Sequence, residues 1–362
     1  MMSCCYFSIF LLKLEYMKRP ELLAPAGNLK KLKFALNYGA DAVYCGVPDF
    51  SLRVRINQFD MRSLKQGIEY AHSLKKKVYV TVNIFAHQKH LKKLESYILK
   101  LKQLKPDALI VSDPGVIVVI KKVWPKAEIH LSTQANCTNS EAVKFWAKQG
   151  VKRIILGREV TLKEIKEIHR AAPKVELECF VHGAMCMSYS GRCLLSKLFT
   201  NRSANLGDCT QPCRWEYKTF LQEVKRPDEL LQIEEDEHGS YIMNSKDLCL
   251  VEYLDELEAA GICSFKIEGR AKSIYYLGSV VNAYKCKIKG ERGKFKEELE
   301  KTQNRGFTSG FLFGKEKCEQ LDNKSHETVD WEFCGEIIDC RGRAAARLYV
   351  VKIKVRNQIF IG

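Results

Sequence analysis

Short apolar runs alternate with longer amphipathic segments between residues 20 and 275. Eight of these runs resemble β-strands, and they begin at Glu21, Asp41, Lys77, Ala108, Glu128, Arg153, Glu176 and Ser264. Intervening segments such as NLKKLKFALNYG and EAVKFWAKQG have helical spacing and end in glycine, a common signal for the end of a helix. Eight strand–helix units predict an α/β fold with a closed, TIM-like (β/α)8 barrel. A doubly wound open sheet is the alternative, although no glycine-rich dinucleotide motif follows the first strand.

Alternate positions within several predicted strands differ in polarity. The polar or aromatic faces comprise Tyr79, Thr81 and Asn83 in the third strand, Glu176, Glu178, Phe180 and His182 in the seventh, and Lys266, Glu268 and Arg270 in the eighth. In a barrel covered by helices, these faces would converge in the lumen and at the carboxyl ends of the strands, where barrel enzymes carry their chemistry. Buried charges are costly unless they are paired or bind a ligand. The charged side chains could therefore form stabilising ion pairs in the lumen or a charged binding pocket, and the sequence leaves both interpretations open.

The remaining segments define the expected domain organisation. The predicted parts are an upstream extension at residues 1–16, the barrel at 17–275 with a cysteine-rich insertion at 184–240, a helical connector at 276–330 and a small β domain at 331–362. The first part lacks a basic start and a clear cleavage site, so a translation start at Met17 is favoured over a signal peptide. Strands that stop at Gly362 would leave edges unpaired, so we expect a C-terminal β domain that is truncated.

Composition narrows the class of protein. The chain of 362 residues is 46% hydrophobic and 28% charged, which excludes disordered, collagen-like and coiled-coil chains. No apolar run approaches the roughly 20 residues needed to cross a bilayer, so no membrane partner is expected. The net charge of +16 favours a polyanionic partner. Fifteen cysteines without a secretion signal indicate reduced thiols in a cytoplasmic protein, some of them holding a metal.

Four cysteines follow the seventh predicted strand in the segment HGAMCMSYSGRCLLSKLFTNRSANLGDCTQPCRW. They are Cys186, Cys193, Cys209 and Cys213, separated by six, fifteen and three residues. Four thiolates in one segment suit an iron–sulfur cluster or a Cys4 zinc site, but the spacing matches neither a zinc ribbon nor a ferredoxin. Iron–sulfur ligation, zinc ligation and unligated redox thiols therefore remain open from the spacing. The expected position beside the catalytic end of the barrel favours a functional site.

The segment ECFVHGAMCMSYSGRCLLS, residues 178–196, closely resembles the signature of the collagenase-like peptidase family of unassigned catalytic type. The resemblance continues through PELLAPAGN, GADAVYCGVPDFSLR and NSKDLCLVEYLDELEAAGICSFKIEGRAKS and covers most of residues 19–312. Within that family, SKDLC and CTQPCRW look most like the prephenate-dependent tRNA uridine hydroxylases, which modify carbon 5 of the wobble uridine. Other relatives hydroxylate a ribosomal RNA cytidine or act in oxygen-independent ubiquinone synthesis.

The resemblance implies a [4Fe–4S] cluster on the four cysteines, tRNA as the substrate and prephenate as a co-substrate. Whether an electron donor takes part is left open by the sequence. It also implies a small β-barrel domain after the TIM-like barrel. Prephenate is a dianion that needs cations in a partly desolvated pocket, and the candidates are Arg53, Arg158, Lys266 and Arg270. Candidates for proton transfer or for orienting the cations are Glu178, His182 and Glu268. Candidates for RNA contact beside the cysteines are Tyr189, Arg192, Arg214 and Trp215.

Two further functions remain in view. A collagenase-like peptidase would cleave peptides without iron, but the sequence displays no arranged nucleophile and base. A non-catalytic nucleic-acid-binding protein with a Cys4 zinc site would bind zinc and tolerate changes at Arg158 or Arg270.

Overall fold

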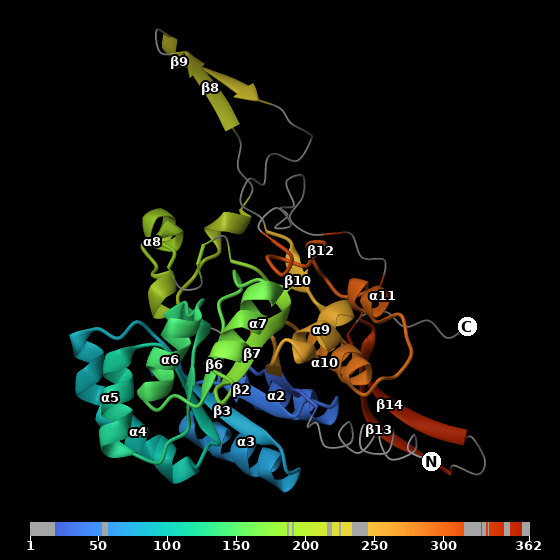
Figure 1. Cartoon of the computed structure of the whole chain (residues 1–362). Helices are drawn as coiled ribbons and strands as arrows, with labels where there is room; N and C mark the ends of the chain where they lie inside the picture. Colours follow the sequence, from blue (N-terminus) through green and yellow to red (C-terminus); the bar gives the residue numbers. More distant parts are fainter. Residues whose placement is uncertain are drawn as a thin grey trace, which may run out of the picture.

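The computed structural model describes residues 19–52, 57–186, 188–189, 192–215, 219–223, 226–233, 245–314, 327, 331, 333–343 and 348–356. Eight parallel strands form a closed ring in its centre (Figure 1): β1 (Glu21–Pro25), β2 (Ala42–Cys45), β3 (Lys77–Val82), β4 (Ala108–Val111), β5 (Ile129–Leu131), β6 (Arg153–Ile155), β7 (Glu176–Ala184) and β11 (Ile262–Ile267). β11 closes the ring by pairing with β1 on one side and β7 on the other. Each predicted run supplies one strand, so the TIM-like barrel is confirmed.

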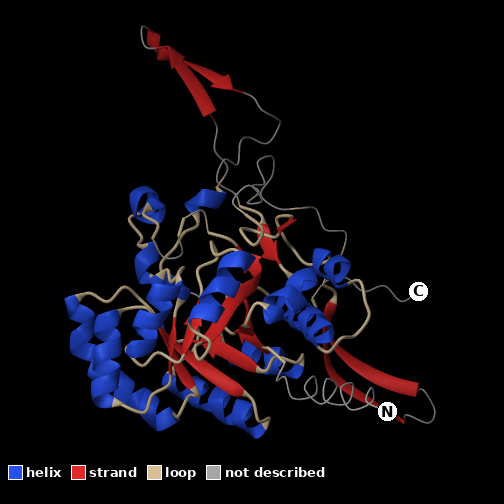
Figure 2. Cartoon of the chain, viewed as in Figure 1, coloured by secondary structure: helices blue, strands red, loops and turns tan. Residues whose placement is uncertain are grey.

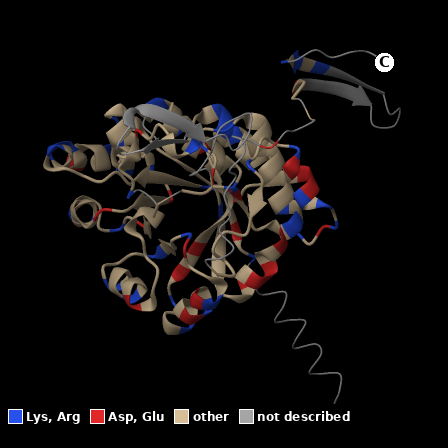
Figure 3. Cartoon of the chain, turned by 90° about the horizontal axis from the view of Figure 1, so that it is seen from above, with Lys and Arg blue, Asp and Glu red and all other residues tan. Residues whose placement is uncertain are grey.

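Helices surround this ring, as the view from above shows (Figure 3). Those that follow the barrel strands are α2 (Leu29–Asn37), α3 (Met61–Ser73), α4 (Gln88–Leu104), α5 (Pro114–Val123), α6 (Ser140–Lys148), α7 (Leu162–Ala171) and α10 (Ile274–Ile288), and α9 (Leu254–Ala259) precedes β11. α7 illustrates the local logic, because Thr161 and Glu164 form a reciprocal capping box at its start. Ile165 and Ile168 are buried on its inner face.

α10 completes the ring of helices by packing on α2 and β1. The Tyr284 hydroxyl on α10 also donates to the Val181 carbonyl oxygen of β7 at 2.8 Å. Residue 275, the expected end of the barrel, falls within the first turn of this helix. The short α11 (Phe295–Glu300) then packs on α10.

Two short strands extend the sheet where β7 ends. β10 (Asp247–Cys249) pairs antiparallel with the last residues of β7, and β12 (Phe307–Thr308) pairs in parallel with β10. The buried Asp247 and Arg305 side chains form an ion pair at 2.8 Å, which ties these strands together. The predicted strand pattern did not include either strand, because each is too short to show a period.

Two hairpins lie outside the barrel (Figure 2). β8 (Thr219–Glu223) and β9 (Arg226–Ile233) project from the end that carries the short helix α8 (Leu195–Thr200). β13 (Gly335–Arg343) and β14 (Leu348–Val355) form an antiparallel pair inside the expected C-terminal β domain. An ion pair of 2.5 Å between Lys30 and Glu336 links this pair to α2. That it begins a closed β-barrel stays a prediction.

None of the described helices combines the length and apolar character required to span a membrane.

Candidate active site at the barrel mouth

A cavity of about 150 Å³ opens at the carboxyl ends of the barrel strands. Side chains from the ends of β2, β3, β5, β6, β7 and β11, or from the loops that follow them, form its floor and walls: Tyr44, Thr81, Asn83, Ser132, Gln134, Arg158, Phe180, Lys266, Glu268 and Arg270. The segment after β7 forms its remaining wall. This is the end at which barrel enzymes carry their chemistry.

All four clustered cysteines line this cavity. Burial raises the pKa of the Cys213 thiol, Arg214 opposes that shift, and the thiols of Cys186, Cys209 and Cys193 add to it. The Cys209 sulfur accepts hydrogen bonds from the Ser196 hydroxyl at 3.6 Å and the Gln211 backbone N–H at 3.4 Å. The fold therefore brings to one cavity four thiols with gaps of up to fifteen residues between consecutive cysteines, and they are candidates to hold a metal cofactor.

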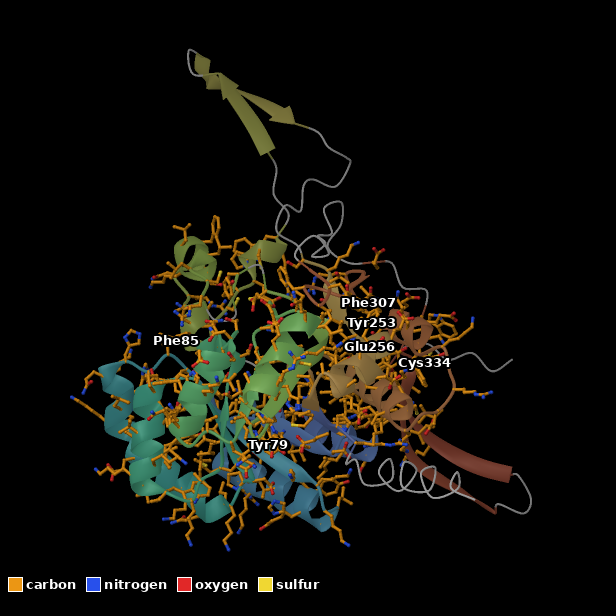
Figure 4. The ribbon with its side chains drawn as sticks, viewed as in Figure 1. Tyr79, Phe85, Tyr253, Glu256, Phe307 and Cys334 are labelled. Atoms are coloured by element: carbon orange, nitrogen blue, oxygen red, sulfur yellow. The ribbon has the colours of Figure 1, made fainter. Side chains whose placement is uncertain are left out.

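The cysteine segment is fastened to the loop after β3. The Phe85 backbone N–H donates to the Asn205 carbonyl oxygen at 3.4 Å, and the Arg192 guanidinium carbon lies 5.8 Å from the Phe85 ring centroid. Phe85 lies at the α8 end of the barrel, whereas Tyr79 on β3 lies toward the opposite end (Figure 4). These contacts hold the cysteines above the lumen.

Three predicted cation candidates meet at the cavity. The Lys266 ammonium lies 4.3 Å from the Tyr44 ring centroid, and burial lowers its pKa. The Arg270 guanidinium donates to the Ser51 hydroxyl at 3.0 Å and the Leu52 carbonyl oxygen at 2.7 Å, which fixes its orientation. The Arg158 guanidinium carbon lies 3.8 Å from the Phe180 ring centroid. The fourth candidate, Arg53, lies outside the described residues.

Glu268 is the predicted carboxylate that lines the cavity. Its Oε2 accepts a hydrogen bond from the Tyr44 hydroxyl at 3.1 Å and another from the Gly269 backbone N–H at 2.9 Å. Two accepted hydrogen bonds and a place in the same cavity lining as the cations suit a carboxylate that orients a substrate or accepts a proton.

Glu178 lies beneath the cavity in the barrel lumen and is fully buried. Its two oxygens contact the Lys266 ammonium at 2.8 Å and an Arg153 nitrogen at 3.2 Å. Burial alone would raise the pKa of Glu178, but the two cations outweigh this effect and lower it. Glu178 therefore holds Lys266 in place through a buried ion pair, as expected if the lumen charges stabilise the barrel.

His182 occupies a different place from the one that the alternation predicts. It is packed among the rings of Tyr276, Tyr284 and Phe307 outside the lumen and is not among the residues that line the cavity. The physical reason is a register shift, since Phe180 pairs with Lys266 whereas His182 pairs with the next residue of β11. Burial lowers the pKa of His182 to about 4, so the imidazole is neutral at physiological pH.

The RNA-contact candidates surround the cysteines. Tyr189 and Trp215 are exposed, with 54% and 40% of their surfaces accessible. The Arg192 Nε donates to the Asn136 side-chain oxygen at 2.9 Å. A terminal nitrogen of Arg214 donates to the Met185 carbonyl oxygen at 3.2 Å, beside the cavity.

Sequence reasoning did not single out Tyr44 or Gln134. The Tyr44 ring lies against Lys266, and the Gln134 side-chain oxygen accepts from the Asn83 amide at 2.7 Å. For Tyr44, the available signal was its position near the carboxyl end of the second predicted strand. Gln134 lies in a loop where no periodic pattern applies.

A cavity with converging charged side chains at the carboxyl ends of the barrel strands is typical of the active site of a barrel enzyme. The chain matches the model of Peptidase family U32 over residues 27–322, and it belongs to this family. The tRNA hydroxylation protein P of Haemophilus influenzae is 41% identical, with 95% of this chain and 84% of that protein covered. The tRNA hydroxylation protein P of Escherichia coli is 44% identical, with 82% and 75% covered. The 23S rRNA 5-hydroxycytidine synthase of Escherichia coli is 34% identical, with 81% and 45% covered.

Proposed function

We propose that this protein is an iron–sulfur enzyme that hydroxylates tRNA, and that it acts at carbon 5 of the wobble uridine with prephenate as the co-substrate. Two relatives that cover most of the chain are named as tRNA hydroxylation proteins. The observation that carries the proposal is the convergence of four thiols and three cations on one cavity at the barrel mouth. The uridine and prephenate specificity follows the family resemblance of the sequence.

The donor set fits a [4Fe–4S] cluster. A single zinc ion needs four thiolates within about 2.3 Å of one point, whereas a four-iron cluster takes one thiolate at each iron around a larger body. The four thiols line one cavity, and the family resemblance of the sequence favours the cluster over zinc. Cys186, Cys193, Cys209 and Cys213 would hold the cluster, which supplies electron transfer when bound.

The remaining cavity residues suit a small dianion. Arg270 is pre-oriented by Ser51 and Leu52, and Lys266 is held by Glu178, so both cations meet a substrate without first reorganising. Arg158 also lines the cavity, beside the Phe180 ring. Glu268 lies among these cations, where it can orient the substrate or accept a proton from it.

RNA reaches this cavity through its exposed rim. Tyr189 and Trp215 offer rings for base stacking, and Arg192 and Arg214 offer charge to the phosphates. Carbon 5 of a uracil must leave the base stack to enter a cavity inside a barrel.

The test combines metal analysis with RNA analysis. After anaerobic purification, the wild type should contain about four irons and four sulfides per chain, and Cys193→Ala should lose them. Cys286→Ala, on α10, is the matched control and should retain them. A strain that lacks its endogenous hydroxylase should regain 5-hydroxyuridine-derived nucleosides in its tRNA with the wild type and Cys286→Ala only. One zinc per chain without sulfide would overturn the cluster assignment. An intact cluster without 5-hydroxyuridine-derived nucleosides in the tRNA would overturn the proposed hydroxylase activity.

The cavity gives no support to peptide cleavage. None of the described residues that line it is a histidine, so it contains no Cys–His pair. Peptide cleavage that survives removal of iron would favour a peptidase over a hydroxylase.

A further inference from the structure

Helix α8 has the reverse of the usual amphipathic arrangement. Ser196 and Thr200, one turn apart, face the cysteine segment, where the Ser196 hydroxyl accepts from the Thr210 backbone N–H at 3.0 Å. Thr200 and Thr210 hydroxyls also lie 3.3 Å apart. Leu194 and Leu198 lie on the opposite side and are 69% and 75% exposed. A short helix that turns small polar residues inward and leucines outward presents a surface built for contact.

Aromatic rings continue this apolar face. Phe199 follows Leu198 and is about half exposed, and its ring centroid lies 6.1 Å from that of Trp215. We call Leu194, Leu198, Phe199 and Trp215 the α8 ridge. The ridge stands above the barrel at the end where the cavity opens (Figure 1).

The charge of the segment that carries the ridge favours a polyanionic occupant, even though Arg202 pairs with Asp208 at 2.6 Å. Residues 185–215 contain four cations, Arg192, Lys197, Arg202 and Arg214, against one carboxylate, Asp208. Proteins bind single-stranded nucleic acids with exposed aromatic rings, on which bases stack, and with neighbouring cations, which contact the phosphates. Proteins that remove a base from its stack often insert apolar side chains between the neighbouring bases.

We propose that the α8 ridge is a wedge for the substrate RNA. Leu194 and Leu198 occupy the gap that the target base leaves when it enters the cavity, and Phe199 with Trp215 stacks a neighbouring base. This inference rests on the proposed function, because it takes the ligand to be an RNA loop. It adds a second role for the cysteine segment, whose α8 part binds the flanking nucleotides.

The experiment uses the full chain and an anticodon stem-loop RNA with 2-aminopurine beside the target uridine. The wild type should change the fluorescence of the probe on binding. Phe199→Ala should weaken binding by roughly 5- to 150-fold, the range expected for one lost stacking contact, and Phe199→Tyr should restore it. Leu198→Ala, which removes the wedge, should also weaken binding and reduce the change in probe fluorescence. Val118→Ala on α5 removes another exposed apolar side chain, 69% accessible against 75% for Leu198, and should bind as the wild type does. Iron content and melting temperature verify that every variant is folded.

The outcomes separate this inference from the proposed function. Equal RNA affinity for the wild type, Leu198→Ala and Phe199→Ala would overturn the wedge, even if tRNA hydroxylation continues. Loss of self-association in these variants, without loss of RNA affinity, would assign the ridge to contact between copies and also overturn it. Ridge-dependent RNA binding without any hydroxylated nucleoside would support the wedge and reject the proposed activity. No RNA binding by the wild type would reject both.

Discussion

Replacement of Glu178 by glutamine tests the electrostatic structure beneath the cavity. Glu178 is the carboxylate that pairs with Lys266, at 2.8 Å, with both side chains buried. Arg153 is less dependent on Glu178, because it also contacts Glu21 at 2.6 Å and Glu176 at 2.8 Å. Glu178→Gln therefore leaves the Lys266 ammonium as an uncompensated buried charge. Breaking one partner of a buried pair costs about 3–5 kcal/mol of unfolding free energy.

An exposed pair of nearly the same length is the matched control. Lys144 and Glu141 on α6 lie 2.7 Å apart, but their side chains are 42% and 79% exposed. Solvent screens such a pair, so Glu141→Gln should leave the unfolding midpoint unchanged within error. The double variant Glu178→Gln/Lys266→Met removes both members of the buried pair and should recover much of the lost stability.

Urea unfolding followed by circular dichroism, at equal iron content, measures these differences. The pKa of Glu178 is lowered in the folded state, so its stabilising effect is present above the ordinary glutamate value of about 4.3. The effect is lost as the pH falls through the lower folded pKa, and the gap between wild type and Glu178→Gln should narrow below about pH 4. If Glu178→Gln is no less stable than Glu141→Gln at pH 7, the argument from buried charge is wrong.

Three further outcomes follow from the site. Burial lowers the pKa of His182 to about 4, so acidification from about pH 6.5 to 4 should reduce the unfolding free energy of the wild type. In urea unfolding at a series of pH values, His182→Gln should lack the part of this decrease that comes from His182. Gly183 has a φ of +106°, and an added Cβ would lie 2.7 Å from the Glu268 carbonyl oxygen. Gly183→Ala should therefore lower the free energy of unfolding by more than about 1 kcal/mol in urea and displace Glu268. Unchanged stability would contradict this reasoning. If prephenate is the co-substrate, Arg270→Lys should weaken its binding at least tenfold in calorimetry at constant iron content. The reason is that an ammonium cannot reproduce the guanidinium contacts with Ser51 and Leu52. Unchanged affinity would exclude Arg270 from the binding site.

The prediction of the barrel succeeded because its signals are local. Each strand is a short buried run, and each intervening helix has a periodic apolar face, so neighbouring residues specify both. The alternation in the eighth predicted strand also placed Lys266, Glu268 and Arg270 at the cavity. The same rule misplaced His182, since a register shift between β7 and β11 reverses the alternation and depends on the pairing of two strands distant in sequence.

The sequence by itself determined the repeating units, the positive charge and the four thiols close to one another along the chain. Only the tertiary structure decided that Glu178 holds Lys266 from below whereas Glu268 lines the cavity, and that Tyr44 lies against the cations. It also decided that Leu194 and Leu198, at the start and in the middle of α8, face solvent. The physical reason is that periodicity is set by a residue's own segment, whereas burial, ion pairing and exposure depend on which distant segments the closed ring brings beside it.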